Sequence, residues 1–329
     1  SHTWMRVTAV HRETLALHDG LQQHSARCAP ALLRELAHHD QVLCVGDWVL
    51  TQTVDEKTWI HQRLPAQNQI LRLDADGGRH AVVSNVDTAL LVMGLDADFN
   101  LARLERYLVL AHSSAVLPVV VLTKADVAEQ TAAGAVQARM DALRERVGRG
   151  VDVIALDARD ASATAQLAPY LGLGQTLVLL GSSGAGKSTL TNSLMGLAVQ
   201  DTGAVRASDS RGQHTTTARS LHQLDQGACV IDTPGVRTLR AEVDAQTLGQ
   251  AFGDVAALAH DCRYRDCRHH DEPGCAVRAQ LDPQRLKNYH KLLRESQRDS
   301  QTPLQRKAKL AQWKSLSRAV RQSHKREDS

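Results

Sequence analysis

Residues 176–197 read TLVLLGSSGAGKSTLTNSLMGL, and this stretch decides the fold of the chain. An apolar strand leads into the P-loop pattern G-x-x-x-x-G-K-S, and a helical stretch follows it. Glycines let successive backbone amides point inward around a β-phosphate, while the N-terminus of the helix adds a dipole that favours the anion. A glycine turn with an incidental lysine is the plain alternative, but the flanking strand and helix favour a nucleotide-binding loop.

Every residue of this loop is a candidate ligand of the nucleotide. The set comprises Gly181, Ser182, Ser183, Gly184, Ala185, Gly186, Lys187, Ser188 and Thr189. The Lys187 side chain should reach the β- and γ-phosphates, and the Ser188 hydroxyl should coordinate Mg²⁺. A P-loop alone does not separate GTPases from ATPases and kinases, so the element that reads the base must decide.

The stretch 123–126 reads TKAD, follows an apolar strand and matches the guanine motif [N/T]KxD. The Asp126 carboxylate can accept hydrogen bonds from the ring N1 proton and the exocyclic amine of guanine, a donor pair that adenine lacks. Thr123, Lys124, Ala125 and Asp126 are therefore candidate GTP ligands. Four residues alone are a weak signal, because a strand-end lysine before a helix-capping aspartate looks similar.

A third element, Asp232-Thr233-Pro234-Gly235, follows another apolar strand. Asp232 is a candidate Mg²⁺ ligand, and the amide of Gly235 can meet a γ-phosphate. The order is unusual, because the guanine motif precedes the P-loop and no second copy follows Gly235. This order predicts a circularly permuted GTPase domain. The rival interpretation is a P-loop phosphotransferase that acts on a small molecule and carries a structural zinc ion.

The elements around these motifs predict a multi-domain α/β protein. Strands alternate with helices over 81–244, which predicts a mainly parallel sheet with helices on both faces. Residues 1–80 carry short strands at close spacing, as in a small β-barrel, and residues 245–329 are helical with a metal cluster and a basic tail. The expected strands are 42–45, 49–53, 58–61, 88–93, 118–122, 151–155, 176–180, 221–224 and 228–231, the last two paired; the expected helices are 101–111, one long helix within 126–147, and 245–259.

Three of the six cysteines lie in the cluster Cys262-x4-Cys267-x-His269-x5-Cys275. Three thiolates and one imidazole complete a tetrahedral Zn²⁺ site and leave no open position, so the cluster predicts one structural zinc ion per chain. His260 and His270 are competitors for the nitrogen position. The segment is too short and polar to bury much apolar surface, which makes a role of the metal in folding plausible.

The net charge of +3 is a sum over unequal parts of the chain. From 285 to 326 there are thirteen lysines or arginines against two acidic residues. Apolar residues recur there at helical spacing, namely Leu310, Trp313, Leu316 and Val320. This pattern predicts a basic amphipathic helix that contacts RNA phosphates or packs its apolar stripe on the zinc domain. A nucleotide-independent RNA-binding module is a third interpretation, but it leaves the phosphate and base motifs unexplained.

Neither a membrane protein nor a secreted disulfide scaffold is indicated. The first thirty residues contain no basic start followed by an apolar run, and no stretch reaches about eighteen uninterrupted apolar residues. The cysteines are few and unevenly placed, which argues against a disulfide framework. The expected location is the reducing cytoplasm, without membrane contact.

The chain resembles the ribosome small-subunit-dependent GTPase A family, known as RsgA or YjeQ. The resemblance rests on the permuted motif order, the RGQHTTT stretch at 211–217, the Cys/His cluster, VGD at 45–47 and NVD at 85–87. It implies an OB-fold barrel, a permuted GTPase domain and a zinc domain that act together in late maturation of the bacterial 30S subunit. The implied partners are GTP, GDP and the 30S subunit with its 16S rRNA. The small subunit should stimulate hydrolysis by a monomeric enzyme.

The catalytic group is inferred from an absence. Val236 follows Gly235, so the glutamine that orients water in Ras-like enzymes is missing. His214 is the candidate substitute, with a solvent-exposed loop histidine as the alternative. Thr215 beside it is a candidate Mg²⁺ ligand, although Thr216 or Thr217 could serve. The resemblance puts a second guanine-facing loop at Asp157-Ala158, to which we assign no site residue.

Overall fold

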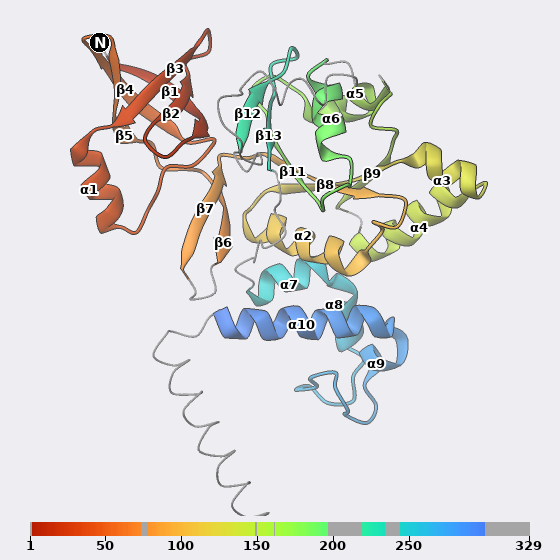
Figure 1. Cartoon of the computed structure of the whole chain (residues 1–329). Coiled ribbons are helices and arrows are strands. Elements are labelled where there is room, and N and C mark those ends of the chain that lie inside the picture. Colours follow the sequence, from red (N-terminus) through yellow and green to blue (C-terminus); the bar gives the residue numbers. More distant parts are fainter. Residues whose placement is uncertain are drawn as a thin grey trace, which may run out of the picture.

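A computed structural model of the chain describes residues 2–73, 78–148, 150–160, 162–196, 219–233 and 244–299. Figure 1 shows three parts, with a small barrel at one side, a helix-covered sheet beside it and a group of helices below the sheet. The expected multi-domain α/β class is confirmed. The boundaries expected after residues 80 and 244 stay predictions; the first falls inside a strand.

The barrel is closed by five strands, β1 (His2–Val10), β2 (Leu15–His18), β3 (Gln23–Cys28), β4 (Trp48–Val54) and β5 (Lys57–Arg63). Their order is β1-β2-β3-β5-β4, and β4 pairs back to β1. Helix α1 (Pro30–His38) lies between β3 and β4, and its Leu32 and Leu36 pack into the barrel core. Period-two alternation puts Val7, Leu17 and Ile60 in that core without exposure. This is the OB-like barrel that the resemblance implied.

The strand expected at 42–45 is wrong. Val45 forms only an isolated bridge to Val83, and the segment turns at Gly46, whose φ is 95°. The Asp47 carboxylate accepts a hydrogen bond from the Cys44 amide at 2.9 Å and thereby holds the turn. A hairpin of β6 (Gln69–Leu73) and β7 (Arg79–Ser84) then leads from the barrel to the large sheet.

The large sheet has the order β10-β9-β8-β11-β13-β12. Its parallel strands are β8 (Thr88–Gly94), β9 (Leu117–Thr123), β10 (Asp152–Ala155), β11 (Thr176–Leu180) and β13 (Cys229–Asp232), while β12 (Ser220–Gln223) pairs antiparallel with β13. The pairing expected between the last two strands is therefore confirmed. Beyond β12, a single residue pair, Ala9 with Ser220, joins the sheet to barrel strand β1.

Helices cover both faces of this sheet, as Figure 1 shows. The helices are α2 (Leu101–Ser113), α3 (Ala125–Thr131), α4 (Ala135–Val147), α5 (Ser162–Leu167) and α6 (Lys187–Leu194). Alternate strand residues serve the two faces: Leu91 joins the core under α2 and α4, whereas Leu90 joins the core under α5 and α6. The single long helix expected within 126–147 is wrong, because Gly134 adopts a φ of 78° and separates α3 from α4.

The C-terminal helices pack under α2. They are α7 (Ala245–Ala251), α8 (Gly253–Ala259), α9 (Ala276–Gln280) and α10 (Pro283–Asp299). The helix expected over 245–259 is in fact two helices, divided at the fully buried Phe252. Both α7 and α10 contact α2, and Arg285 of α10 also donates to the Arg146 carbonyl oxygen on α4, so the C-terminal part is attached to the sheet domain through α2 and α4.

Charged residues are buried where these helices meet. We call Glu105, Asp254, Arg285 and Asn288 the buried seam, in which the Asp254 side chain is 33% exposed and the other three residues are buried. Arg285 Nη1 donates to Glu105 Oε1 at 2.7 Å, and its Nε and Nη2 donate to the two oxygens of Asp254 at 2.5 and 2.8 Å. Asn288 donates to the second Glu105 oxygen. The exposed fractions of Glu105 and Arg285 are 1% and 3%, so these charges are removed from water but fully paired.

Candidate functional site

The predicted P-loop connects β11 to α6 and requires its glycines. A Cβ at Gly181 would clash with the carbonyl oxygen of Val92 on the neighbouring strand β8. Gly184 and Gly186 adopt φ values of 83° and 92°, which favour glycine over other residues. The loop therefore wraps around the start of α6 at the carboxyl end of β11, where parallel sheets carry their ligand sites.

Lys187 folds back over this loop. Its Nζ donates to the carbonyl oxygens of Gly181 and Ser182 at 2.9 and 2.7 Å. Burial lowers the pKa of Lys187, and the nearby carboxylates of Asp232 and Asp98 oppose that shift. The structure thus brings the lysine of the P-loop and the aspartate at the end of β13 into one electrostatic environment. Ser188 is exposed in the first turn of α6, and Thr189 is partly buried.

The guanine motif touches the P-loop directly. Thr123, fully buried at the end of β9, donates from Oγ1 to the carbonyl oxygen of Ala185 at 2.6 Å. Lys124 follows with a φ of 60°, and its Nζ lies 2.6 Å from Asp96 Oδ2. The hydrogen bond from Lys124 holds the pKa of Asp96 below its ordinary value. The two predicted motifs, distant in the sequence, therefore form one edge of the sheet.

Asp126 lies in the first turn of α3, and its two oxygens have different surroundings. Oδ2 accepts a hydrogen bond from Arg159 Nη2 at 2.5 Å. Oδ1 is buried and has no hydrogen-bond partner. Arg159 also contacts Asp157, with its Nε 3.2 Å from Asp157 Oδ1, and this hydrogen bond lowers the pKa of the Asp157 carboxyl. The loop after β10 thus lies against Asp126, as the resemblance implied.

Sequence reasoning missed two residues at this edge. Arg159 is one; its only signal was a charge directly after the expected second guanine-facing loop at Asp157-Ala158. Asp98 is the other: Ser182 donates from Oγ to Asp98 Oδ1 at 2.5 Å, and Arg103 Nη2 lies 2.6 Å from the same oxygen. No pattern in the sequence connects Asp98 with the P-loop. A cleft of about 570 Å³ opens beside them and reaches α10 through Asn288 and Lys291.

Several predicted residues lie outside the described part of the chain. These are His214, Thr215 and Gly235, together with Pro234, Val236 and the apolar stripe of the basic tail.

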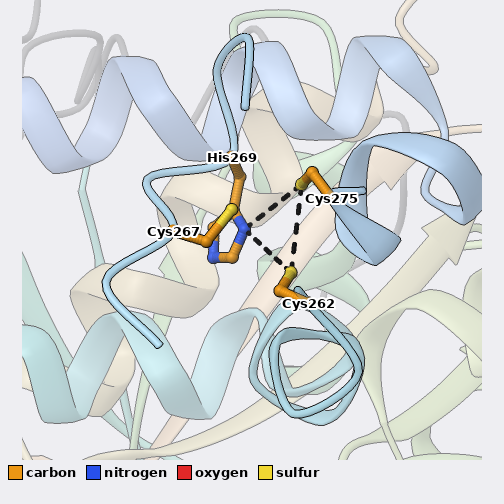
Figure 2. Close-up of side chains that lie close together, drawn as sticks. All are labelled: Cys262, Cys267, His269 and Cys275. Carbon is orange, nitrogen blue, oxygen red and sulfur yellow. Dashed lines mark hydrogen bonds between the residues drawn. The ribbon is translucent and has the colours of Figure 1, made fainter. Parts of the chain in front are cut away.

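The Cys/His cluster brings its four predicted residues together, as Figure 2 shows. Cys262 follows α8, Cys267 and His269 lie on the next loop, and Cys275 caps α9. His269 Nδ1 lies 3.6 Å from Cys262 Sγ and 3.5 Å from Cys275 Sγ, and the two sulfurs are 3.9 Å apart. The four ligand atoms lie within 4.8 Å of one another, so the cluster could hold a metal ion.

His269 rather than its neighbours supplies the nitrogen. It adopts a φ of 61° and is buried, and its carbonyl oxygen contacts His290 Nε2 at 3.1 Å. His270 instead stacks on His290, with ring centroids 3.9 Å apart. Burial raises the pKa of the Cys267 thiol to about 11, whereas at Cys262 hydrogen bonds from the backbone of Val277 and Ala276 and from the other two cysteines together outweigh burial and lower the pKa. A lowered pKa favours the thiolate that binds metal.

A parallel sheet in which the guanine motif precedes the P-loop, with the two motifs in contact, defines the class of circularly permuted P-loop GTPases. A family model described as RsgA GTPase matches residues 63–242, more than half of the chain. The chain belongs to the RsgA GTPase family, and it is a GTP hydrolase. A model described as ABC transporter matches 165–322, a range that includes the P-loop common to both classes.

Curated relatives support the same assignment. A protein of Xylella fastidiosa (strain 9a5c) named "Small ribosomal subunit biogenesis GTPase RsgA" is 48% identical over 268 residues, which cover 79% of this chain and 75% of the relative. A protein of the same name from Xanthomonas campestris pv. campestris (strain B100) is 48% identical over 255 residues, which cover 75% of this chain and 68% of the relative.

Two solved structures share the fold. YjeQ from Thermotoga maritima matches with a TM-score of 0.64 and 23% identity, over 90% of this chain and 99% of that one. YloQ, described as a circularly permuted GTPase, matches with a TM-score of 0.60 and 23% identity, over 92% and 97%. Among the described residues, no helix has the length and apolar character that a bilayer crossing requires.

Proposed function

We propose that this chain hydrolyses GTP to GDP and phosphate in the late maturation of the small ribosomal subunit. The observation that carries the GTPase part is the hydrogen bond from Thr123 to Ala185, which joins the guanine motif to the P-loop. The ribosomal part is supported by the relatives, which are named for small ribosomal subunit biogenesis and are 48% identical. Stimulation of hydrolysis by the 30S subunit is part of the proposal.

The proposal includes the ligands of the base and of the phosphates. Asp126 would bind the guanine edge, with Thr123, Lys124 and Ala125 shaping the base pocket. The amides of 181–189 would surround the phosphates. Lys187 now donates to two loop carbonyls, and its Nζ would shift to phosphate oxygens with little change of backbone. The phosphate oxygens could replace the two carbonyl oxygens as hydrogen-bond acceptors, because the charged ammonium is already held inside the loop.

Ser188, Asp232 and Thr215 are the proposed Mg²⁺ ligands. The ion would supply neutralisation of charge on the β- and γ-phosphates. Asp232 lies at the end of β13, close enough to Lys187 to influence its pKa, and Ser188 starts α6 beside the loop. We propose His214 as the group that orients water and Gly235 as the amide that meets the γ-phosphate.

We propose zinc as the metal of the cluster formed by Cys262, Cys267, His269 and Cys275. Zinc with Zn–S bonds of about 2.3 Å and Zn–N bonds of about 2.0 Å requires S···S separations of about 3.8 Å and S···N separations of about 3.5 Å at tetrahedral angles. The observed separations of 3.9, 3.6 and 3.5 Å among Cys262, His269 and Cys275 fit these requirements, and the Cys267 sulfur lies within 4.8 Å of the other ligand atoms. Three thiolates and one imidazole fill the coordination sphere, so the ion would stabilise the loop rather than act on substrate.

The proposed partners are GTP, GDP and the 30S subunit with its 16S rRNA, which would place the monomeric protein in the cytoplasm and away from membranes. The proposed domains are the barrel at 1–80, the GTPase domain at 81–244 and the zinc domain with its tail at 245–329. The zinc loop carries exposed arginines at 263, 265 and 268, which suit contact with RNA phosphates.

The test combines base selectivity with activation. GTP hydrolysis should rise when purified 30S subunits are added, and GDP should bind far more tightly than ADP. Asp126→Asn should weaken GDP binding about ten- to hundredfold and favour xanthosine diphosphate, because a charge-assisted pair of hydrogen bonds is lost. Asp141→Asn, an exposed aspartate on α4, is the matched control. Equal binding of ATP and GTP would instead favour the phosphotransferase interpretation.

A further inference from the structure

Three charged residues meet where the guanine base would sit. Asp126 is in the first turn of α3, and Asp157 and Arg159 belong to the loop after β10. Arg159 Nη2 lies 2.5 Å from Asp126 Oδ2 and 3.2 Å from Asp157 Oδ2, and Arg159 Nε lies 3.2 Å from Asp157 Oδ1. One guanidinium therefore contacts two carboxylates, and the shorter contact is with the residue proposed to read the base.

The two oxygens of Asp126 differ in their hydrogen bonding, and this difference points to a missing donor. Oδ2 is engaged by Arg159, whereas Oδ1 is buried without any hydrogen-bond partner. A buried acceptor without a donor is unfavourable, so this oxygen marks a position that a ligand should satisfy. The Watson–Crick edge of guanine offers two adjacent N–H donors, which matches a carboxylate with both oxygens available.

Arginine and guanine present the same chemistry to a carboxylate. The N1–C2–N2 fragment of guanine is itself a guanidine unit, and an arginine guanidinium likewise offers adjacent N–H donors in one plane. A carboxylate oxygen has two lone pairs, so two donors exclude each other there only when both approach it from the same side. On that condition Arg159 and the base are alternatives at Asp126 Oδ2.

We propose that Arg159 competes with guanine for Asp126 and so gates entry of the nucleotide, an inference that rests on the proposed GTP-binding function. In the nucleotide-free chain the hydrogen bond from Arg159 blocks the Asp126 carboxylate, which would read the base; we call this the closed position of Arg159. When the base arrives, Arg159 leaves Asp126 and remains bound to Asp157, whose carboxylate already accepts from its Nε and Nη2 and from its backbone amide. Asp157 therefore holds the Arg159 side chain in its open position, in which Asp126 is accessible to the base.

The gate has a defined kinetic consequence. When only a fraction of molecules is competent to bind, the apparent affinity falls by that fraction. Opening precedes binding, so the loss appears in the association rate constant, while dissociation from the nucleotide-bound complex, in which Arg159 is already on Asp157, is unaffected. Arg159 side-chain exposure is 56%, so the contact with Asp126 is one that water and salt can weaken and that a ligand can replace.

The experiment is stopped-flow binding of a fluorescent GDP and GTP to the full-length wild-type chain, Arg159→Ala, Arg159→Lys and Arg144→Ala. Arg144 is an exposed arginine of α4 paired with Asp141, and its variant controls for the loss of one surface charge. Arg159→Ala should associate about fivefold faster with an unchanged dissociation rate, because the exposed competing contact is modest. Arg159→Lys should fall between wild type and alanine, and Arg144→Ala should match the wild type in both rate constants.

Opposite results would overturn the gate. Faster dissociation in Arg159→Ala would mean that Arg159 holds the bound base, and an unchanged association rate would mean that the contact only fixes the loop after β10. If the proposed GTP-binding function itself were wrong, the binding experiment would give a different result. If the wild-type chain bound ADP as well as GDP, the guanine site and the gate would both be wrong, whereas a guanine preference with unaltered association would remove the gate alone.

Discussion

The nucleotide edge and the buried seam use charged residues in opposite ways. By the nucleotide edge we mean the sheet edge that carries the P-loop, the guanine motif and the loop after β10. At the edge, Arg159 is more than half exposed and contacts two carboxylates, and one oxygen of Asp126 has no partner. In the seam, Arg285 is almost fully buried, and its three guanidinium nitrogens donate to Glu105, to Asp254 and to two backbone carbonyls. Charges at the edge can change partners, and charges in the seam cannot.

The difference follows from solvation. A charge removed from water is tolerated only when every hydrogen-bonding group is satisfied, so loss of one seam partner leaves the others in a costly state. An exposed pair contributes little to stability and loses little when it opens. Substitutions at the edge should therefore change binding or turnover with little effect on folding, and substitutions in the seam should do the reverse.

The largest effect should come from Lys187→Met at the edge. Loss of the ammonium that contacts phosphate should reduce turnover at least about a hundredfold, the size expected for one transition-state donor. Burial already lowers the pKa of Lys187, so the charged form is disfavoured there, and an apolar replacement should leave the free energy of unfolding unchanged or raise it. Phosphate release and thermal unfolding measure the two quantities. Lys287→Met, at an exposed lysine of α10, is the control; full turnover by the Lys187 variant would show that the P-loop acts without it.

Glu105→Gln should produce the opposite pattern. The variant leaves buried Arg285 with one carboxylate, and we expect the free energy of unfolding to fall by about 2 to 4 kcal/mol. Turnover well below the unfolding temperature should stay near the wild-type value, because Glu105 does not contact the P-loop residues described above. Urea unfolding provides the measurement, with Glu145→Gln at an exposed site on α4 as the control. Equal stability of the two variants would mean that the seam contributes nothing beyond its apolar neighbours.

The smallest effect on the rest of the molecule should come from metal removal. A chelator should free the loop between Cys262 and Cys275, and trypsin should then cleave after Arg263, Arg265 or Arg268 about tenfold faster, because the ligands supply the folding energy of so short a segment. Cleavage at Arg34 on α1, far from the cluster, is the internal control. GDP affinity should change less than about twofold, because the seam holds α10 without the metal. A large loss of GDP affinity would show that the cluster supports the edge directly.

The sequence predicted the edge better than the seam. Strands 117–123 and 176–180 are apolar runs that lead into the guanine motif and the P-loop, so their chemistry could be located without coordinates. The seam joins residues more than a hundred positions apart that no periodicity connects. Glu105 looks like an ordinary helix-surface residue, and only the packing of α10 on α2 makes it a buried one.

Local errors have local causes. The break between α3 and α4 depends on Gly134 and on Glu129, whose carboxylate accepts from the Gly134 amide at 2.6 Å, a contact that propensity does not reveal. The turn at 42–47 replaced an expected strand because Asp47, fully buried, offers its oxygens to Cys44, Ser84 and Arg63. Arg159 escaped notice because Asp126, the partner that links it to the site, lies in another element, α3, and its charge alone is typical of any exposed surface.

The single residue pair between β1 and β12 has a consequence for solubility. Strand β12 ends the large sheet, and an uncovered end strand presents free amides and carbonyls to which another chain can add. Ala9 takes up this position beside Ser220, while Arg6 ties β1 to the sheet domain through the Thr176 hydroxyl and the Asn85 carbonyl. The barrel therefore serves as a lateral cap that keeps the GTPase sheet from growing by intermolecular pairing, independently of whatever the barrel recognises.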